Sequence, residues 1–211
     1  TTKKFKPDYR AFLSVIDSVV EPNSFNEAVK DAGWRKAMEN EMKALTDNKT
    51  WTMEVLPEGK KALGCKWLYK IKYKSDSTIK RLKTRLVVFG NHQTEGIDYD
   101  ETFAHVAKMT TVRTFLTVAA AKDWILHQTD VHNAFLHDDL EEEVYMRVPP
   151  GFSPPLPEMV CRLRKSLYAL KQAPRCWFAK FGEALKAYGF TQSHSDYSLF
   201  ILITTKSSLF V

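Results

Sequence analysis

The sequence predicts a mixed α+β fold from its size and from two kinds of apolar spacing. Its 211 residues, 44% of them hydrophobic, are enough to bury a sizeable core. Apolar residues alternate with lysines over residues 66–74, which is typical of a half-buried strand. Elsewhere they recur at helical intervals, as they do at Trp34, Met38, Met42 and Leu45.

The chain begins with a segment that predicts little structure, followed by a helix. Residues 1–22 have little periodicity and are interpreted as a leader or linker, while residues 23–211 are interpreted as one domain. Ser24 and Glu27 have the spacing of a capping box, so a helix is expected there, with a break at Gly33. Its Trp and Met stripe indicates core packing.

A strand over residues 51–55 and then a two-stranded hairpin are expected. The first strand of the hairpin carries lysines on one face, apart from Leu68, and on the other face it carries Trp67, Tyr69, Ile71 and Tyr73. Turn residues at 75–78 lead into a second strand over residues 79–89. Its inward side chains are expected to be Leu82, Leu86 and Val88.

Caps, breakers and short apolar runs predict the remaining elements. We expect a helix from Thr110 or Thr111 to residue 121, and then a buried strand over residues 124–126. Further strands are expected over residues 144–148 and 159–163. Pro174 favours the start of a helix that stops at Gly189, and a hairpin is expected over residues 198–204 and 209 onward.

Positive charge is concentrated in the predicted hairpin. The net charge of the chain is +6, yet ten Lys or Arg residues and only one acid, Asp76, lie between residues 60 and 85. Such a patch favours a polyanionic partner, either a nucleic-acid backbone or a nucleotide triphosphate. The alternative is a solvated hairpin whose lysines only keep the protein in solution.

Cysteine usage and hydropathy exclude several classes of protein. Cys65, Cys161 and Cys176 show no paired spacing, so neither a disulfide framework nor a zinc ribbon is expected. The longest apolar run, residues 197–203, is too short to cross a membrane, and no secretory signal is visible. We expect an intracellular protein that is not secreted and has no membrane partner. Because it lacks an initial Met and ends within a predicted strand, we expect a piece of a longer protein.

Asp130, which follows the apolar segment over residues 124–126, is the strongest single candidate for chemistry. A carboxylate placed where a strand ends at a cleft can bind a hard cation such as Mg²⁺. The same residue can instead cap a turn or helix over residues 131–136, because Asp is a favoured N-cap. The residue alone does not decide between these two roles.

Four blocks of sequence resemble, in the same order, the reverse transcriptase domain of copia-type (Pseudoviridae) retrotransposon Pol polyproteins. They are Trp51 with residues 66–70, then residues 96–103, 128–136 and 165–175. The resemblance implies a right-hand polymerase fold with fingers, a partial palm and no thumb. It implies RNA-directed DNA polymerase activity by two-metal nucleotidyl transfer in the parent protein, with Mg²⁺ or Mn²⁺. The implied partners are an RNA or DNA template with its primer, deoxynucleoside triphosphates, and the rest of the Pol polyprotein with its integrase and RNase H.

The resemblance also assigns roles to individual residues. Asp130 would be the catalytic and metal-binding carboxylate, and Phe135 would pack under the sugar of the incoming nucleotide. Either Lys83 or Arg85 would contact the triphosphate, and the choice between them stays open.

Two further groups of residues would contact the substrates. Tyr168, Lys171 and Gln172 would bind the nucleotide, although their loop could instead serve only to cap the helix that follows. The nucleic-acid backbone would contact Lys66, Lys70, Lys72, Lys74, Lys80 and Arg81.

Two departures from the family pattern bear on activity. The family completes its metal site with an Asp-Asp pair on the strand after the final hairpin, and we expect this chain to be truncated before that motif and inactive by itself. Ala169 stands where the family has Gly, and its Cβ is expected to crowd a backbone that approaches the substrate. Whether the chain is an enzyme is left open.

Two other functions also stay open. A catalytically dead fragment would act at most as a basic nucleic-acid-binding module, whose affinity falls steeply with salt and ignores both Asp130 and Mg²⁺. A metal-dependent nuclease built on Asp130 and nearby acids would cleave nucleic acid without added nucleotides.

Overall fold

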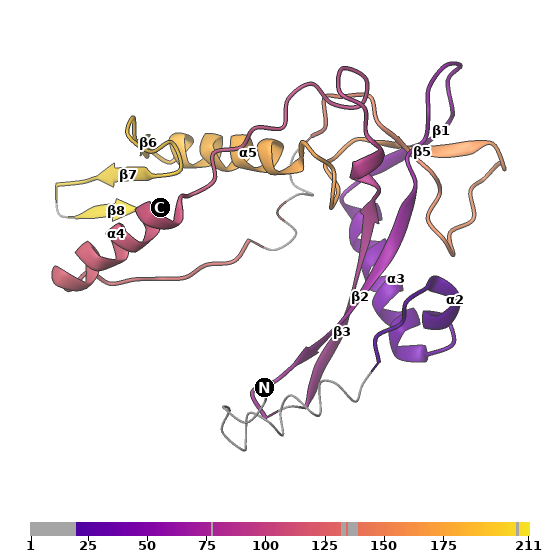
Figure 1. The fold of residues 1–211 in the computed structure, drawn as a ribbon, viewed down its shortest axis with the longest axis horizontal. Helices are drawn as coiled ribbons and strands as arrows, with labels where there is room; N and C mark the ends of the chain where they lie inside the picture. The colour runs from indigo at the N-terminus through magenta and orange to yellow at the C-terminus, as the bar shows by residue number, and fades with distance from the viewer. Residues whose placement is uncertain (1–19, 77, 132–133, 135–138, 206) are drawn as a thin grey trace.

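The protein has a mixed α and β fold with three small sheets (Figure 1). The computed structural model describes residues 20–76, 78–131, 134, 139–205 and 207–211. Two helices come first, α2 (Phe25–Ala28) and α3 (Ala32–Asp47). The Ser24 hydroxyl accepts a hydrogen bond from the Glu27 N–H at 3.3 Å, which confirms the predicted helix start. The break was predicted at Gly33 but lies at residues 29–31, because Asp31 begins α3 by accepting from the Trp34 N–H.

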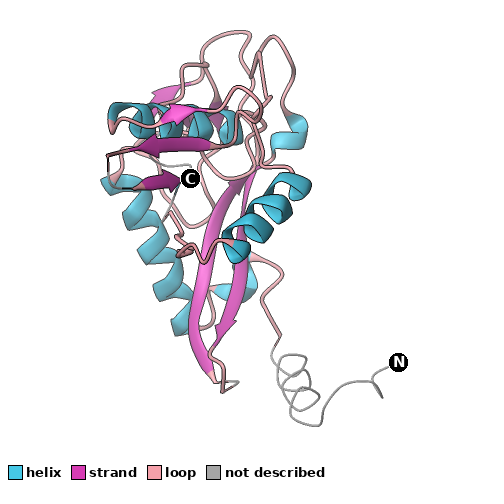
Figure 2. Cartoon of the chain, turned by 90° about the vertical axis from the view of Figure 1, so that its left-hand side faces the viewer, coloured by secondary structure: helices cyan, strands magenta, loops and turns pink. Residues whose placement is uncertain are grey.

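The predicted hairpin is confirmed as an antiparallel ribbon of β2 (Cys65–Tyr73) and β3 (Ile79–Val88). Its register places Lys70 opposite Lys83. Alternate side chains of β2 are buried and exposed, as the alternating pattern predicts. Figure 2 shows α3 lying along one side of this ribbon. On that side Trp34 meets the edge of Tyr69 at 5.4 Å, and the fully buried Leu86 and Leu45 belong to the same core.

A second sheet contributes buried residues to the same core, among them Met146, Cys161 and Leu163. It contains β1 (Trp51–Val55), β5 (Met159–Leu163) and β4 (Tyr145–Met146), in the order β1-β5-β4. The strands predicted over residues 51–55 and 159–163 are confirmed, whereas the strand predicted over residues 144–148 is only two residues long. Pro149 and Pro150 follow it, and proline supplies no N–H to extend a ladder.

A short 3₁₀ turn, η2 (Gly90–His92), directly follows β3. Most of the remaining elements form a separate group, on the left in Figure 1. They are α4 (Met109–Ala121), α5 (Ala173–Ala187), β6 (Thr191–Gln192), β7 (Phe200–Ile203) and β8 (Ser208–Phe210). The predicted final hairpin is confirmed as β7 and β8, and β6 adds a strand that was too short to predict. Gly189 follows α5 with φ of 103°, as expected of a helix stop. Helix α4 is also confirmed, but neither Thr110 nor Thr111 caps it, because it begins at Met109.

The buried strand predicted over residues 124–126 is wrong. These residues belong to no strand, and the side chains of Ile125 and Leu126 are 84% and 53% exposed. Trp124 stacks on Phe210 of β8, with ring centroids 5.0 Å apart. A strand needs a neighbour for its backbone N–H and C=O groups, and within the described residues β6, β7 and β8 pair only with one another. Within the same described residues, no helix is long and apolar enough to cross a membrane.

Candidate nucleotide and nucleic-acid interface

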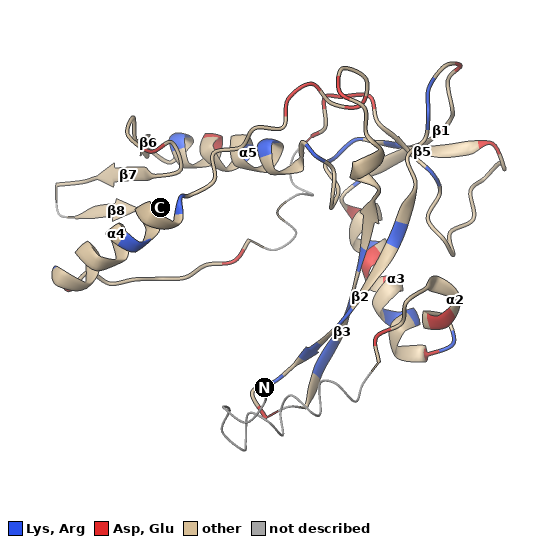
Figure 3. Cartoon of the chain, in the orientation of Figure 1, with Lys and Arg blue, Asp and Glu red and all other residues tan. Residues whose placement is uncertain are grey.

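The register of the hairpin gathers six basic side chains on its solvent face. Residues opposite each other in an antiparallel pair share a face, and the pairs are Lys66 with Val87, Leu68 with Arg85, Lys70 with Lys83, and Lys72 with Arg81. The buried aromatic residues of β2 point to the opposite face. We call this set the basic face, and it consists of Lys66, Lys70, Lys72, Arg81, Lys83 and Arg85, of which Lys83 is half-buried. Figure 3 shows this basic stretch along both strands. Lys74 and Lys80 lie nearer the tip of the ribbon.

Two glutamates lie along the outer edges of this ribbon. Glu21 accepts from the Ile71 N–H at 2.9 Å and pairs with Lys70 at 3.0 Å. These contacts lower the pKa of Glu21 although partial burial opposes them. On the other edge, Glu41 of α3 accepts from the Leu86 N–H, and burial raises the pKa of its carboxyl against the attraction of Lys83 and Arg85. Burial, Arg85 and Arg81 lower the pKa of Lys83.

The loop over residues 168–172, which we call the pocket loop, attaches directly to the edge of β3. The Val88 N–H donates to the Tyr168 carbonyl oxygen at 3.1 Å. The Arg85 guanidinium lies over the Tyr168 ring, 4.9 Å from its centroid, at cation–π distance. Burial raises the pKa of Tyr168, which keeps its hydroxyl protonated. Arg85, and not Lys83, is therefore the basic residue that contacts the pocket loop.

Lys171 and Gln172 contact a second loop, over residues 93–99. The Lys171 ammonium donates to the Tyr99 hydroxyl at 3.1 Å and lies over the Tyr99 ring. Gln172 is fully buried, and its Nε2 donates to the Asp98 carbonyl oxygen at 3.0 Å. The predicted contacts of Lys171 and Gln172 with a nucleotide stay predictions, and in this structure both side chains hold loops together.

Sequence reasoning missed Gln93, which lies at the centre of this arrangement. Its Oε1 accepts from the Lys171 N–H at 2.8 Å, and its Nε2 donates to Gln172 Oε1 at 3.0 Å. No local signal could have revealed these contacts, since the partners are 78 and 79 residues away in the sequence.

Ala169 has a backbone conformation that favours glycine. Its φ is 71°, in the left-handed region where a Cβ is strained. This backbone conformation explains why the family has glycine at this position, where the present chain has alanine. The Ala169 carbonyl also lies so close to Gly90 that a Cβ on Gly90 would overlap its oxygen. The pocket loop therefore lies too close to the end of β3 for any side chain at Gly90.

Asp130 lies exposed in the extended segment after α4. Phe135, predicted to pack under the sugar, lies outside the described residues. Asp196, another acid near the final hairpin, accepts from the Ser198 N–H and hydroxyl at 2.9 and 2.6 Å, and these bonds lower its pKa. Among the described residues no three His, Cys, Asp or Glu side chains are grouped to hold a metal ion. One carboxylate does not satisfy a two-metal centre, so the described residues do not fit that group.

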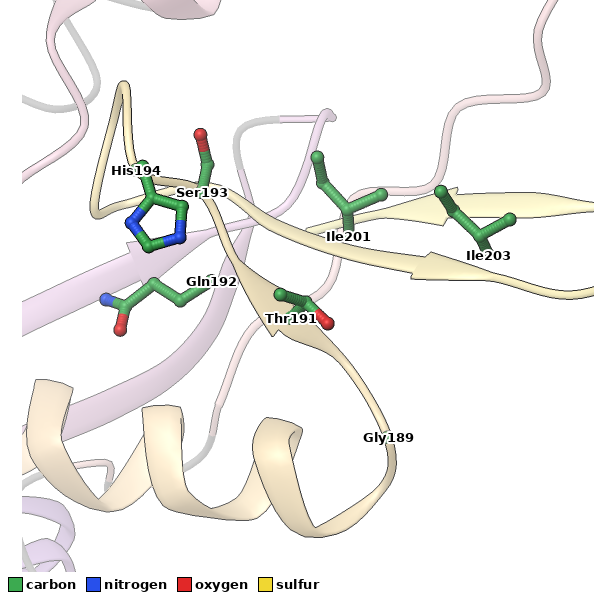
Figure 4. Close-up of a pocket in the computed structure, with 7 residues that line it drawn as sticks. All are labelled: Gly189, Thr191, Gln192, Ser193, His194, Ile201 and Ile203. Carbon is green, nitrogen blue, oxygen red and sulfur yellow. The ribbon is translucent and has the colours of Figure 1, made fainter.

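A pocket elsewhere in the molecule carries none of the predicted residues. It lies beside the turn after α5, with walls that include Thr191, Gln192, Ile201 and Ile203 (Figure 4). No Lys or Arg is among its lining residues, all of which are described, so it offers no cation for a triphosphate. The candidate interface is therefore the basic face together with the pocket loop.

Comparison with known proteins decides the family. Residues 48–211 match the family described as reverse transcriptase (RNA-dependent DNA polymerase). The chain belongs to this reverse transcriptase family. The match contains the hairpin, both loops and Asp130, and it confirms the resemblance inferred from the four sequence blocks.

Three relatives of this reverse transcriptase domain are retrovirus-related Pol polyproteins from transposons. It is 43% identical over 209 residues to the retrovirus-related Pol polyprotein from transposon RE1 of Arabidopsis thaliana, covering 98% of this chain and 14% of that protein. It is 44% identical over 209 residues to the corresponding polyprotein from transposon RE2 of the same plant, with the same coverage. For transposon TNT 1-94 of Nicotiana tabacum, identity is 47% over 180 residues, covering 83% of this chain and 14% of that protein. No solved structure matches the chain.

Proposed function

We propose that this reverse transcriptase domain binds a primer–template and a deoxynucleoside triphosphate through one surface, made by the basic face and the pocket loop. In the parent Pol polyprotein this surface would serve RNA-directed DNA synthesis. The β2–β3 ribbon and α3 would form the fingers, and the elements from α4 onward would contribute part of the palm of a right-hand polymerase. Residues 23–211 would be the domain and residues 1–22 its leader.

The contact of Arg85 with Tyr168 is the observation that carries this proposal. Tyr168 belongs to the family block at residues 165–175 and Arg85 to the basic hairpin, and the guanidinium lies 4.9 Å from the ring centroid. A triphosphate on the basic face would therefore lie beside the loop proposed to contact the base and sugar. A guanidinium can donate two parallel hydrogen bonds to phosphate oxygens, which an ammonium cannot do, and this favours Arg85 for the triphosphate.

The basic face would also bind the backbone of the template. It carries six cations on a ribbon that buries its other side, so the charges cannot turn inward without unpacking the core. Among the described residues, Lys66, Lys72 and Arg81 of this face make no ion pair with a carboxylate. Phosphate contacts of this number imply a loss of affinity of about a thousandfold between 50 and 200 mM salt.

Asp130 would provide a catalytic carboxylate in the parent protein, with Phe135 under the sugar. We assign no catalytic step to this carboxylate by itself, because the described residues contain no group of three His, Cys, Asp or Glu side chains that could hold a metal ion. In the complete polyprotein, Asp130→Asn should abolish polymerisation while primer–template affinity stays within twofold of wild type. Polymerisation that survives Asp130→Asn would remove Asp130 from the chemistry.

Binding measurements on the chain itself test the proposed surface. The matched variants are Arg85→Ala on the basic face and Arg113→Ala on the exposed side of α4. With oligo(dT) on poly(rA), Arg85→Ala should weaken dTTP binding about tenfold, the value of one charge-assisted hydrogen bond, and Arg113→Ala should not. Equal effects of both variants would contradict the proposal.

A second function, a catalytically dead nucleic-acid-binding module, is favoured by the concentration of unpaired lysines on the ribbon. It predicts salt-sensitive binding of primer–template with no binding of dTTP. The dTTP measurement with Arg85→Ala therefore separates the two functions, because only the polymerase surface requires a triphosphate site.

A further inference from the structure

We infer that Gln93 is a positioning residue that fixes the pocket loop for the incoming nucleotide. The inference rests on the proposed function, because it assigns Gln93 to the nucleotide part of the proposed surface. Gln93 acts through the loop, because its side chain bonds to Lys171 and Gln172.

Gln93 lies in the middle of an unbroken chain of hydrogen bonds. The Lys171 N–H donates to Gln93 Oε1 at 2.8 Å, Gln93 Nε2 donates to Gln172 Oε1 at 3.0 Å, and Gln172 Nε2 donates to the Asp98 carbonyl oxygen at 3.0 Å. A backbone N–H can only donate and a carbonyl oxygen can only accept, so the two ends fix the orientation of both amide groups. Exchanging N and O in either side chain would break two bonds.

Because both glutamine side chains are buried, breaking these hydrogen bonds would cost free energy, and the bonds therefore restrain the loop. Gln93 is 5% exposed and Gln172 is fully buried. A buried amide left without a partner costs about 1–3 kcal/mol, so neither side chain can turn away from the other without loss. The Lys171 ammonium adds a bond to the Gln93 carbonyl oxygen at 3.3 Å, which ties the same pair of residues through the main chain as well.

The pocket loop is therefore held at both of its ends. At its first residue, Tyr168 accepts from the Val88 N–H of β3, and Arg85 lies over its ring. At its last residues, Lys171 and Gln172 are bonded to Gln93, which follows β3 by only the short turn η2. Because β3 and Gln93 are nearly consecutive in the chain, the basic face and the pocket loop are fixed to the same stretch of backbone.

Between these two attachments the loop contains a strained residue. Ala169 adopts a φ of 71°, which an alanine leaves readily when neighbouring contacts allow it. Removal of the Gln93 side chain would break two bonds of the second attachment, those to the Lys171 N–H and to Gln172 Oε1, and so weaken the restraint on Ala169. The Tyr168 ring would then lose its fixed position beside Arg85, and the nucleotide would meet a mobile loop. The expected consequence is a weaker affinity for the nucleotide and an unchanged affinity for the primer–template.

The test compares Gln93→Ala with Gln192→Ala in the full chain. Gln192 is the control, since its Nε2 also donates a hydrogen bond, here to the Tyr197 carbonyl oxygen at 2.6 Å, but in the sheet of β6 and β7. Three quantities are measured: hydrogen exchange of the Lys171 amide, the Kd for dTTP in the presence of oligo(dT) on poly(rA), and the Kd for that primer–template. Gln93→Ala should raise the exchange rate at least tenfold and weaken dTTP about tenfold, with the primer–template Kd within twofold. Gln192→Ala should change none of them.

A conservative variant separates positioning from general destabilisation. Gln93→Glu keeps an acceptor for the Lys171 N–H and loses the donor to Gln172, so exchange at Lys171 should return toward the wild-type rate. Unchanged exchange and dTTP affinity in Gln93→Ala would overturn the inference, and so would equal losses of dTTP and primer–template affinity. If wild type fails to bind dTTP and Arg85→Ala changes nothing, the proposed function fails, while the exchange of Lys171 still decides the role of Gln93.

Discussion

The β2–β3 ribbon and the segment that follows α4 are both rich in apolar residues, yet they differ in how those residues are used. In the ribbon, Trp67, Tyr69 and Leu86 are buried against α3. In the segment after α4, Ile125 and Leu126 are 84% and 53% exposed, and no strand pairs with them within the described chain. The ribbon carries the proposed substrate contacts, and the segment carries Asp130.

This difference indicates that the proposed binding surface and Asp130 are positioned in different ways. The basic face and pocket loop are positioned by contacts among described residues, including the bonds of Tyr168 and Gln93. The catalytic role proposed for Asp130 instead requires further carboxylates that the described residues do not supply. The predictions below test whether the two regions differ as much as their packing indicates.

The largest expected effect comes from removing one leucine side chain from each region. Leu86→Ala should lower the free energy of unfolding by about 3 kcal/mol, because the side chain is fully buried. Leu126→Ala should change it by less than about 0.5 kcal/mol, because its side chain is largely exposed. Urea denaturation of both variants measures the difference, and similar losses would show that the segment after α4 is packed.

Gly90 tests the close approach between the ribbon and the pocket loop. Gly90→Ala should cost about 2 kcal/mol, because the new Cβ would overlap the Ala169 carbonyl oxygen. Gly59→Ala is the matched control, since φ of 78° strains an alanine there but nothing lies within 4 Å of its Cβ. Its cost should be only about 1 kcal/mol. Urea denaturation that ranks Gly59→Ala above Gly90→Ala would contradict the close approach.

Periodicity predicted the parts of the fold that bury one face of an element. The alternation over residues 66–74 gave the correct buried face, because a half-buried strand needs an apolar residue at every second position. The segment over residues 124–126 was misjudged by the same reasoning, since a short apolar run does not reveal whether a partner strand is present. Strand pairing is a long-range property, and β1 pairs with β5 across more than a hundred residues.

The candidate site was predictable where a family block or a charge pattern marked it. The lysine pattern located the basic face, and the blocks at residues 128–136 and 165–175 drew attention to Asp130 and the pocket loop. Gln93 carried no such signal, because its partners are brought to it only by the folded chain. The choice between Lys83 and Arg85 likewise needed the position of Tyr168.

Ala169 gives a smaller, stabilising effect. Ala169→Gly should raise the free energy of unfolding by about 1 kcal/mol, because glycine adopts a φ of 71° without steric strain. The corresponding change at Ala179 of α5, in a helix interior, should lower it by about 1 kcal/mol. Urea denaturation compares the two signs, and destabilisation by Ala169→Gly would contradict the strained conformation.

The smallest effect is a pH dependence at Glu41. Burial raises the pKa of Glu41 above its ordinary value of 4.5, so ionising it costs more in the folded protein than in the unfolded chain. Its contribution to stability is therefore fully present below pH 4.5 and is lost as the pH rises from there through the raised pKa. Glu41→Gln removes this loss. In urea denaturation, the free energy of unfolding of the variant should therefore rise relative to that of wild type as the pH is raised above 4.5. Parallel pH profiles would contradict it.

Primer extension by this chain tests the central claim most directly, which is that its described residues bind substrates without completing the chemistry. The assay uses oligo(dT) on poly(rA) with dTTP and Mg²⁺, and binding of the primer–template is measured in parallel. We predict binding that weakens about a thousandfold between 50 and 200 mM salt, and no extension. Extension that Asp130→Asn abolishes would contradict the claim, because other acids of this chain would then complete the metal site.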